Sequence, residues 1–164
     1  MAEPTLHIRP FQPGDASAFR DLNEQWILKY FSLEESDRVT LGHPESSVLQ
    51  PGGHIFMAML GDIPVGCCAL LADGPGVFEL GKMAVMEGHR GLGIGRKILE
   101  HVIAQARALG ARSLHLGTHS KLAGAIHLYE TVGFRHVPPD QAPASPYARA
   151  EVFMDLQLQA NKWP

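Results

Sequence analysis

The sequence predicts a mixed α/β fold, in which helices pack on a central sheet. Residues 54–85 contain three strand-like apolar runs separated by short glycine-bearing turns, which is typical of an antiparallel meander. The apolar residues of 92–109 then recur at helical spacing, so this helix joins two strands that we expect to be parallel neighbours. No repeat or linker interrupts the 164 residues, which favours a single domain spanning residues 1–164.

The N-terminal third predicts one strand followed by helices. Residues 5–11 alternate in hydrophobicity and are stopped by Pro10, as expected of a first strand. Proline, glycine and Asp15 then provide a helix start, and large apolar residues recur at helical spacing as far as Tyr30. The polar stretch 32–53 is interrupted by proline and glycine, which indicates a short helix and a loop.

The remaining elements follow in a regular order. The strands of the meander are expected at 54–60, 63–71 and 77–85, with Gly61-Asp62 as the first turn. After the helix at 92–109, the pattern predicts a strand at 113–118, a helix at 122–132, a short strand at 134–137, a proline-rich loop at 138–147 and a last strand at 150–158.

Composition and charge narrow the class of protein. A formal net charge of -3 argues against a nucleic-acid-binding surface, which needs an excess of basic residues. Cys67 and Cys68 are adjacent, so a disulfide between them would be strained and we expect reduced thiols. The apolar runs are shorter than a membrane span, and the first residues lack the pattern of a secretion signal. These features predict a cytoplasmic protein without a membrane or nucleic-acid partner.

The stretch HRGLGIGRKIL, His89–Leu99, carries a glycine at every second position from Gly91 to Gly95. Glycines between a strand and a helix leave backbone N–H groups free, and the helix dipole adds attraction for an anion. The stretch fails the P-loop pattern, because Ile94-Gly95 stands where Lys and Ser or Thr are needed. It fails the dinucleotide pattern because Arg96 replaces the third glycine. A pyrophosphate site and a glycine-rich turn without a ligand both stay open on this evidence.

The surroundings of the glycines resemble a known family. The residues RGLGIG, 90–95, are similar to motif A of the GCN5-related N-acetyltransferase (GNAT) superfamily: Arg or Gln, two residues, Gly, any residue, then Gly or Ala. The stretch AIHLYETVGF, 125–134, resembles motif B of the same family. The order of the predicted elements also agrees with the family's fold. The resemblance covers residues 54–137 and is looser outside them.

The resemblance implies both a fold and a ligand. The fold would be a mixed, mostly antiparallel sheet of about six or seven strands with about four flanking helices, splayed at the strand that binds acetyl-CoA. Acetyl-CoA would be the acyl donor, with its pyrophosphate on residues 90–97 and its pantetheine amides on the backbone of 83–85. The cofactor-binding residues that follow from the resemblance are Met83, Ala84, Val85, Arg90, Gly91, Leu92, Gly93, Ile94, Gly95, Arg96, Lys97, Thr118, Ser120, Ala125 and Ile126.

Acyl transfer to an amine needs a group that deprotonates the amine and a group that protonates the leaving thiolate. The resemblance places Tyr129 where family members often carry the acid, and a phenol of pKa about 10 can donate to a thiolate of pKa about 8.5. Glu79 is the candidate base, since strand alternation puts it on the same face as Val77 and Met83. A core aromatic at Tyr129 and a solvated carboxylate at Glu79 are the competing structural interpretations. Direct transfer would need no covalent enzyme intermediate.

The acceptor is expected to bind between residues 15–41 and the loop 138–149, which line the acceptor cleft in the family. The acidic run 34–37 would attract a cationic amine, although a solvated surface is the commoner role of such a run. The candidate acceptor-binding residues are Trp26, Tyr30, Tyr147 and Arg149.

A small-molecule primary amine is favoured as the acceptor, because the loop 138–149 would close the groove that a peptide needs. A protein N-terminus or lysine as acceptor, and a non-catalytic acyl-CoA-binding sensor, are the alternatives. No metal is expected, since the nine histidines and two cysteines do not follow zinc-ligand spacing. A homodimer is compatible with the sequence.

Overall fold

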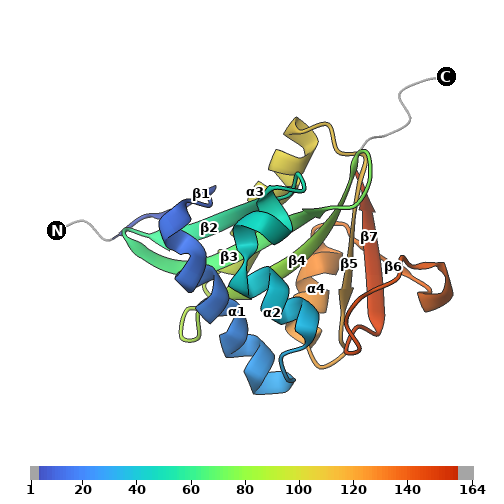
Figure 1. Cartoon of the computed structure of the whole chain (residues 1–164), viewed down its shortest axis with the longest axis horizontal. Coiled ribbons are helices and arrows are strands. Elements are labelled where there is room, and N and C mark those ends of the chain that lie inside the picture. The colour runs from blue at the N-terminus through green and yellow to red at the C-terminus, as the bar shows by residue number, and fades with distance from the viewer. Residues whose placement is uncertain (1–3, 159–164) are drawn as a thin grey trace.

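The computed structural model describes residues 4–158, which form a seven-stranded sheet with helices on both faces (Figure 1). The strands are β1 (Leu6–Pro10), β2 (His54–Leu60), β3 (Ile63–Ala72), β4 (Val77–Val85), β5 (Ser113–Thr118), β6 (Arg135–Val137) and β7 (Val152–Gln157). Their order is β1-β2-β3-β4-β5-β7-β6, and the β4–β5 pair is parallel while the other described pairs are antiparallel. The predicted mixed sheet, its meander and its parallel pair are confirmed.

Two helices cover each face of the sheet (Figure 1). Helices α1 (Ala16–Tyr30) and α2 (Glu35–Gly42) lie on one face, and α3 (Ile94–Ala108) and α4 (Ala123–Thr131) lie on the other. The polar stretch before β2 contains α2 and a short π-helix, Glu45–Leu49. One-turn 3-10 helices occur at Pro13–Asp15 and Pro139–Gln141.

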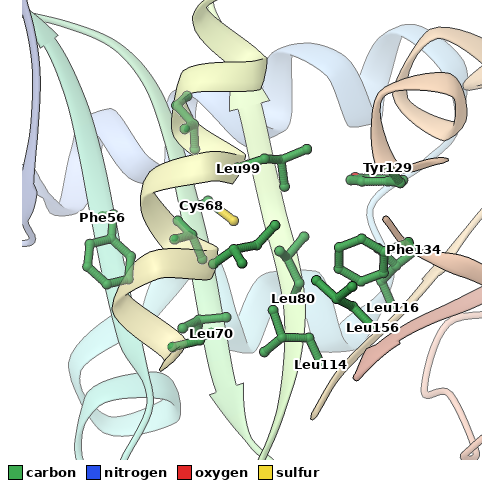
Figure 2. Packing of buried hydrophobic residues seen from close by; sticks show 14 of the residues in the cluster. Phe56, Cys68, Leu70, Leu80, Leu99, Leu114, Leu116, Tyr129, Phe134 and Leu156 are labelled. Atoms are coloured by element: carbon green, nitrogen blue, oxygen red, sulfur yellow. The ribbon is translucent and has the colours of Figure 1, made fainter. Parts of the chain in front are cut away.

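Each pair of helices packs against its own face of the sheet and forms a separate apolar cluster with it. On the α3 side, Leu99 belongs to one buried cluster with Leu80 and Leu114 of the central strands (Figure 2). On the α1 side, Phe19 belongs to a second cluster with Met57. Each fully buried side chain of this size contributes about 1.5–3 kcal/mol, so the two clusters hold the strands and helices in register.

The parallel pair β4–β5 is joined only over its first residues. Val77–Glu79 pair with Ser113–His115, and the two strands then continue without pairing to each other. Beyond this point β4 is paired on its outer side by β3, and β5 on its outer side by β7. The backbone groups that face the gap between β4 and β5 are therefore available to a ligand, and the predicted splay is confirmed.

A bulge in β4 changes which side chains share a face. The register against β3 slips by one residue between Gly81 and Ala84, and Lys82 adopts a left-handed conformation with φ 49°. Met83 consequently packs toward the α3 cluster, while Glu79 lies on the α2 side. The prediction that Glu79 and Met83 share a face was wrong, because regular alternation does not include the extra residue.

Candidate active site

The loop between β4 and α3 presents free backbone amides. Gly91 and Gly93 have φ angles of 82° and 79°, a conformation that other residues rarely adopt. The amides of residues 91–93 make no hydrogen bond to the described part of the chain, and no side chain caps α3, whose N-cap is Gly93. Unpaired N–H groups and the positive end of the helix dipole together favour a phosphate at this position.

A first cavity, of about 540 Å³, extends from this loop along the gap between β4 and β5. Residues 80–85 of β4 and 116–118 of β5 form its walls, together with the start of α3 and residues 121–125 and 127–129 around α4. Its volume is in the usual range for small-molecule sites. The unpaired edge of β4 is suited to extend its hydrogen bonds onto the peptide-like amides of a bound ligand.

His89 adds a polar atom that sequence reasoning missed. Its Nδ1 is buried without a hydrogen-bond partner in residues 4–158, and the residue lines the first cavity. A buried nitrogen of this kind costs free energy unless a ligand or water meets it. The atom fits a ligand with polar groups beside the glycine loop, as coenzyme A has. Its only sequence signal is its position directly before the motif that starts at Arg90.

The first cavity brings together most residues that were predicted to hold the cofactor: Met83, Ala84, Val85, Arg90, Gly91, Gly93, Ile94, Gly95, Arg96, Thr118 and Ala125. Four others lie outside its lining. Leu92 is 65% exposed to solvent, and Lys97 lies one residue beyond the part of α3 that lines the cavity. The Ser120 hydroxyl donates to Glu151, and Ile126 packs against the apolar core.

Tyr129 reaches the first cavity from α4 while its ring is packed in the core. The residue is 8% exposed, and its ring centroid lies 5.8 Å from that of Phe134 (Figure 2). Burial raises the pKa of the phenol, and the nearby Cys68 thiol raises it further. The hydroxyl makes no hydrogen bond to another described residue. It is therefore protonated at neutral pH and free to donate to a ligand atom.

A second cavity, of about 330 Å³, lies on the α2 side of the sheet. Its walls come from α1, α2, the splayed strands β4 and β5, and residues 146, 147, 149 and 150 of the loop before β7. The residues that line both cavities are Trp26, Leu80, Gly81, Lys82, Gly117, Thr118 and Leu122. The two cavities therefore meet where β4 and β5 separate, so that ligands from opposite faces of the sheet can come into contact.

Glu79 lines the second cavity at the last position of β4 that pairs with β5, opposite His115. Burial raises the pKa of Glu79, and the charges of His115 and Lys82 reduce this effect without cancelling it. Its carboxylate has no hydrogen bond or ion pair within residues 4–158. A partly buried, unpaired carboxylate with a raised pKa is suited to accept a proton near neutral pH.

A buried ion-pair network forms one wall of the second cavity. Lys82 Nζ donates to Asp37 Oδ1 at 2.6 Å and to Tyr147 Oη at 2.8 Å. Arg149 donates to both carboxylate oxygens of Asp37, each at 2.7 Å, and its guanidinium carbon lies 4.5 Å from the Tyr147 ring centroid. Burial alone would raise the pKa of Asp37, but the hydrogen bonds from Arg149 and Lys82 lower it to about 2.

The structure distributes the predicted acceptor residues over both cavities. Trp26 lines both, Tyr147 and Arg149 line the second, and Tyr30 lines only the first. Lys82 was not predicted as a site residue, although a lysine inside the apolar strand run 77–85 is unusual and was the available signal.

Three of the described histidines, His115, His119 and His136, each lie beside a single carboxylate. His115 Nε2 lies 2.6 Å from Asp73, and His119 Nε2 lies 3.4 Å from Glu151. Within residues 4–158, no three side chains of His, Cys, Asp or Glu are grouped to hold a metal ion. The helices of this range are also too short or too polar to cross a bilayer.

Solved structures share this splayed arrangement of strands and helices. An acetyltransferase of the GNAT family from Staphylococcus aureus superposes with a TM-score of 0.85 at 22% identity, covering 94% of this chain and 100% of that one. A Salmonella typhimurium protein solved with its cofactor acetyl-CoA gives a TM-score of 0.71 at 21% identity, covering 97% of each chain. The fold is therefore that of the GNAT acetyltransferases.

Sequence relatives extend this result from the fold to the family. The acetyltransferase (GNAT) family profile matches residues 16–134. An uncharacterized N-acetyltransferase of Schizosaccharomyces pombe is 32% identical over 148 residues, which cover 85% of this chain and 90% of the relative. The IAA acetyltransferase of Azospirillum brasilense is 34% identical over 115 residues, which cover 68% of this chain and 72% of that protein. The chain belongs to the acetyltransferase (GNAT) family, as the resemblance of its two motifs predicted.

Proposed function

We propose that this chain is a single-domain, acetyl-CoA-dependent N-acetyltransferase that acts on a primary amine of a small molecule. The observation that carries the proposal is the meeting of two cavities at the β4–β5 gap, one beside the glycine loop and one containing Glu79. When bound, acetyl-CoA supplies an acetyl group activated as a thioester. The Salmonella neighbour solved with acetyl-CoA, and a Bacillus subtilis neighbour solved with CoA, support this choice of donor.

In this proposal the backbone holds the donor. The free amides of residues 91–93 and the first turn of α3 bind the pyrophosphate, and Arg90 and Arg96 add positive charge at the cavity wall. The unpaired edge of β4 binds the pantetheine amides. His89 Nδ1 takes a hydrogen bond from, or donates one to, a polar group of the donor, according to its protonation.

Two side chains of this chain move the protons. Glu79 accepts the proton that the attacking amine nitrogen gives up, and Tyr129 donates its hydroxyl proton to the departing sulfur. The new C–N bond forms as the C–S bond breaks, so a neutral amine loses one proton to Glu79 and the sulfur gains one from Tyr129. An acceptor that arrives as an ammonium ion first loses a further proton to solvent, and proton exchange with solvent afterwards restores Glu79 and Tyr129. Glu79 and Tyr129 line different cavities that meet at the gap, which supports separate contacts of the base with the acceptor and of the acid with the donor.

The loop before β7 supports a small acceptor. The backbone amide of Ala148 donates to Glu34 at 2.8 Å, and Arg149 lies 3.4 Å from the same carboxylate. These contacts tie the loop to the start of α2, and loop residues Pro146 and Tyr147 line the second cavity. A protein substrate would need an open groove for several residues on each side of the amine.

The proposal is tested with a panel of primary amines, by following thiol release from acetyl-CoA and the mass of each product. We expect at least one amine to give acetylated product and CoA in equal amounts. The Glu79→Gln variant, assayed on the same panel, provides the background. Thiol release that never exceeds this background, from a protein that still binds acetyl-CoA, would contradict the proposal and support the acyl-CoA-binding sensor.

A further inference from the structure

The charges of the second cavity indicate which amines it accepts. We propose that the acceptor is a cationic primary amine with an apolar body and no carboxylate group. This inference rests on the proposed function and deepens it, since it concerns the substrate class of the same site.

Both cations that line the second cavity are already bound. Lys82 and Arg149 share Asp37 through three hydrogen bonds of 2.6–2.7 Å. The side chain of Asp37 is 0% exposed, that of Lys82 is 5% exposed and that of Arg149 is 13% exposed. Glu34 lies 3.4 Å from Arg149 as a second anion. An acceptor carboxylate would have to displace Asp37, and a buried carboxylate that loses its cations is strongly destabilised.

The ionisable groups that are left around the cavity are mostly acidic. Glu79 lines it without an ion pair in the described chain. Glu35 also lines it, and its contact with Arg38, at 3.7 Å, joins two exposed side chains. His119 lies on the cavity wall at 3.4 Å from Glu151. An arriving ammonium group therefore meets unpaired negative charge, and an arriving carboxylate meets repulsion.

The remaining walls are largely apolar and aromatic. Trp26 and Phe31 meet edge to face with ring centroids 6.5 Å apart, and both line the cavity together with Tyr147. A volume of about 330 Å³ is at the small end of ligand cavities, which suits a short alkyl or single-ring body. Val39, Leu71 and Leu122 also line the cavity as aliphatic residues.

Matched acceptor pairs test this class with the complete, unmodified chain. At saturating acetyl-CoA, kcat/KM is measured for 2-phenylethylamine against L-phenylalanine, and for hexylamine against 6-aminohexanoate. We expect kcat/KM to be at least about tenfold higher for 2-phenylethylamine and hexylamine than for their carboxylate-bearing partners, because each partner brings an unpaired carboxylate into the cavity. Equal or better use of the carboxylate-bearing partner in both pairs would overturn the inference.

A binding measurement separates this inference from the proposed function. The same four compounds are titrated calorimetrically into the CoA-saturated protein, which requires no turnover. If no compound is acetylated but the amines still bind more tightly by about tenfold, the acceptor class holds and the catalytic proposal fails. If amines and carboxylate-bearing partners bind equally, the acceptor class is overturned whatever the rates are.

Variants at the network test the physical cause. Asp37→Asn releases Lys82 and Arg149, so the preference for amines over their carboxylate partners should fall by about tenfold. Glu34→Gln removes only the more distant anion, so it should reduce the preference for amines without a carboxylate by less than Asp37→Asn does. If Asp37→Asn does not fold, Glu34→Gln provides the test instead. Glu130→Gln is the matched control, because Glu130 binds His136 and lines neither cavity. An unchanged preference in the folded variants would show that this network does not select the acceptor.

Discussion

The two cavities are built from different parts of the polypeptide. The first takes its proposed anion site from one contiguous segment, in which the backbone of residues 91–93 presents N–H groups without a partner in the described chain. The second is assembled from side chains that are far apart in the sequence, such as Lys82 and Tyr147, which are hydrogen-bonded to each other although they are 65 residues apart. A backbone site depends on local conformation, whereas a side-chain site depends on how distant elements pack. We therefore expect mutations to act differently on the two cavities.

Replacement of the proposed base, Glu79, should give the largest effect on kcat/KM and should leave acetyl-CoA binding in the first cavity unchanged. In Glu79→Gln, kcat/KM is expected to fall by about 10²–10⁴, while the dissociation constant of acetyl-CoA stays unchanged. Wild-type kcat/KM should rise with pH through the raised pKa of Glu79, because only the ionised carboxylate accepts a proton, and this rise should disappear in the variant. A pH–rate profile beside the Glu130→Gln control measures both effects. Loss of acetyl-CoA binding would indicate a structural role instead.

Replacement of the proposed acid, Tyr129, should lower the rate of acetyl transfer without changing the affinity for acetyl-CoA. Because Tyr129 keeps its proton at neutral pH, Tyr129→Phe should lower kcat by about 10² through loss of the donor to sulfur. Acetyl-CoA affinity should stay close to wild type, since the ring and its packing on Phe134 are retained. Steady-state kinetics and a binding titration provide the comparison. An unaltered kcat would leave Tyr129 as a core aromatic only.

The network of the second cavity should be visible in the stability of the protein at low pH. The pKa of Asp37 is lowered to about 2, so its ion pairs stabilise the fold fully above the ordinary pKa of 3.8 and are lost as pH falls toward 2. The shift corresponds to about 2 kcal/mol of unfolding free energy. Urea unfolding between pH 5 and pH 2 should show this loss in wild type and a smaller one in Asp37→Asn. Equal acid sensitivity of the two proteins would contradict the assignment.

Backbone strain at the glycine loop should give the smallest effect, confined to the first cavity. Gly93→Val forces a branched side chain into a left-handed conformation, at a cost of about 1–2 kcal/mol, and should weaken acetyl-CoA binding about tenfold. Gly110→Val is the matched control: Gly110 lies at the other end of the same helix with φ 80°, and an added Cβ meets no atom within 4 Å at either glycine. Calorimetry should show weaker binding in Gly93→Val alone, with similar losses of stability in both variants. A matching loss of affinity in Gly110→Val would contradict a local role of the loop.

This contrast also explains what the sequence could predict. The strand and helix order, the meander and the parallel β4–β5 pair follow from local periodicity and from turn chemistry, and all are confirmed. The loop between β4 and α3 follows from three closely spaced glycines, and anion binding there stays a prediction. The bulge at Lys82 does not follow from a local pattern, because it depends on the pairing register between β3 and β4. This bulge places Met83 on the opposite face of the sheet from Glu79.

The network of the second cavity lay beyond prediction for the same reason. Asp37 and Lys82 are 45 residues apart, and only the packing of α2 over the bulged strand brings them together. Tyr30, predicted beside the acceptor, is the last residue of α1 and lines only the first cavity. Contacts of this kind have no local pattern, so the sequence indicated Arg149 and Tyr147 as candidates without indicating what they bind.

The most direct test of the account is a calorimetric titration of acetyl-CoA into the wild-type protein. We expect one molecule to bind per chain, with a dissociation constant in the micromolar range that is common for such substrates. The Glu79→Gln protein should give the same constant, because Glu79 lines only the second cavity. Absence of binding at millimolar acetyl-CoA would contradict the central claim that the glycine loop and the β4–β5 gap hold this donor.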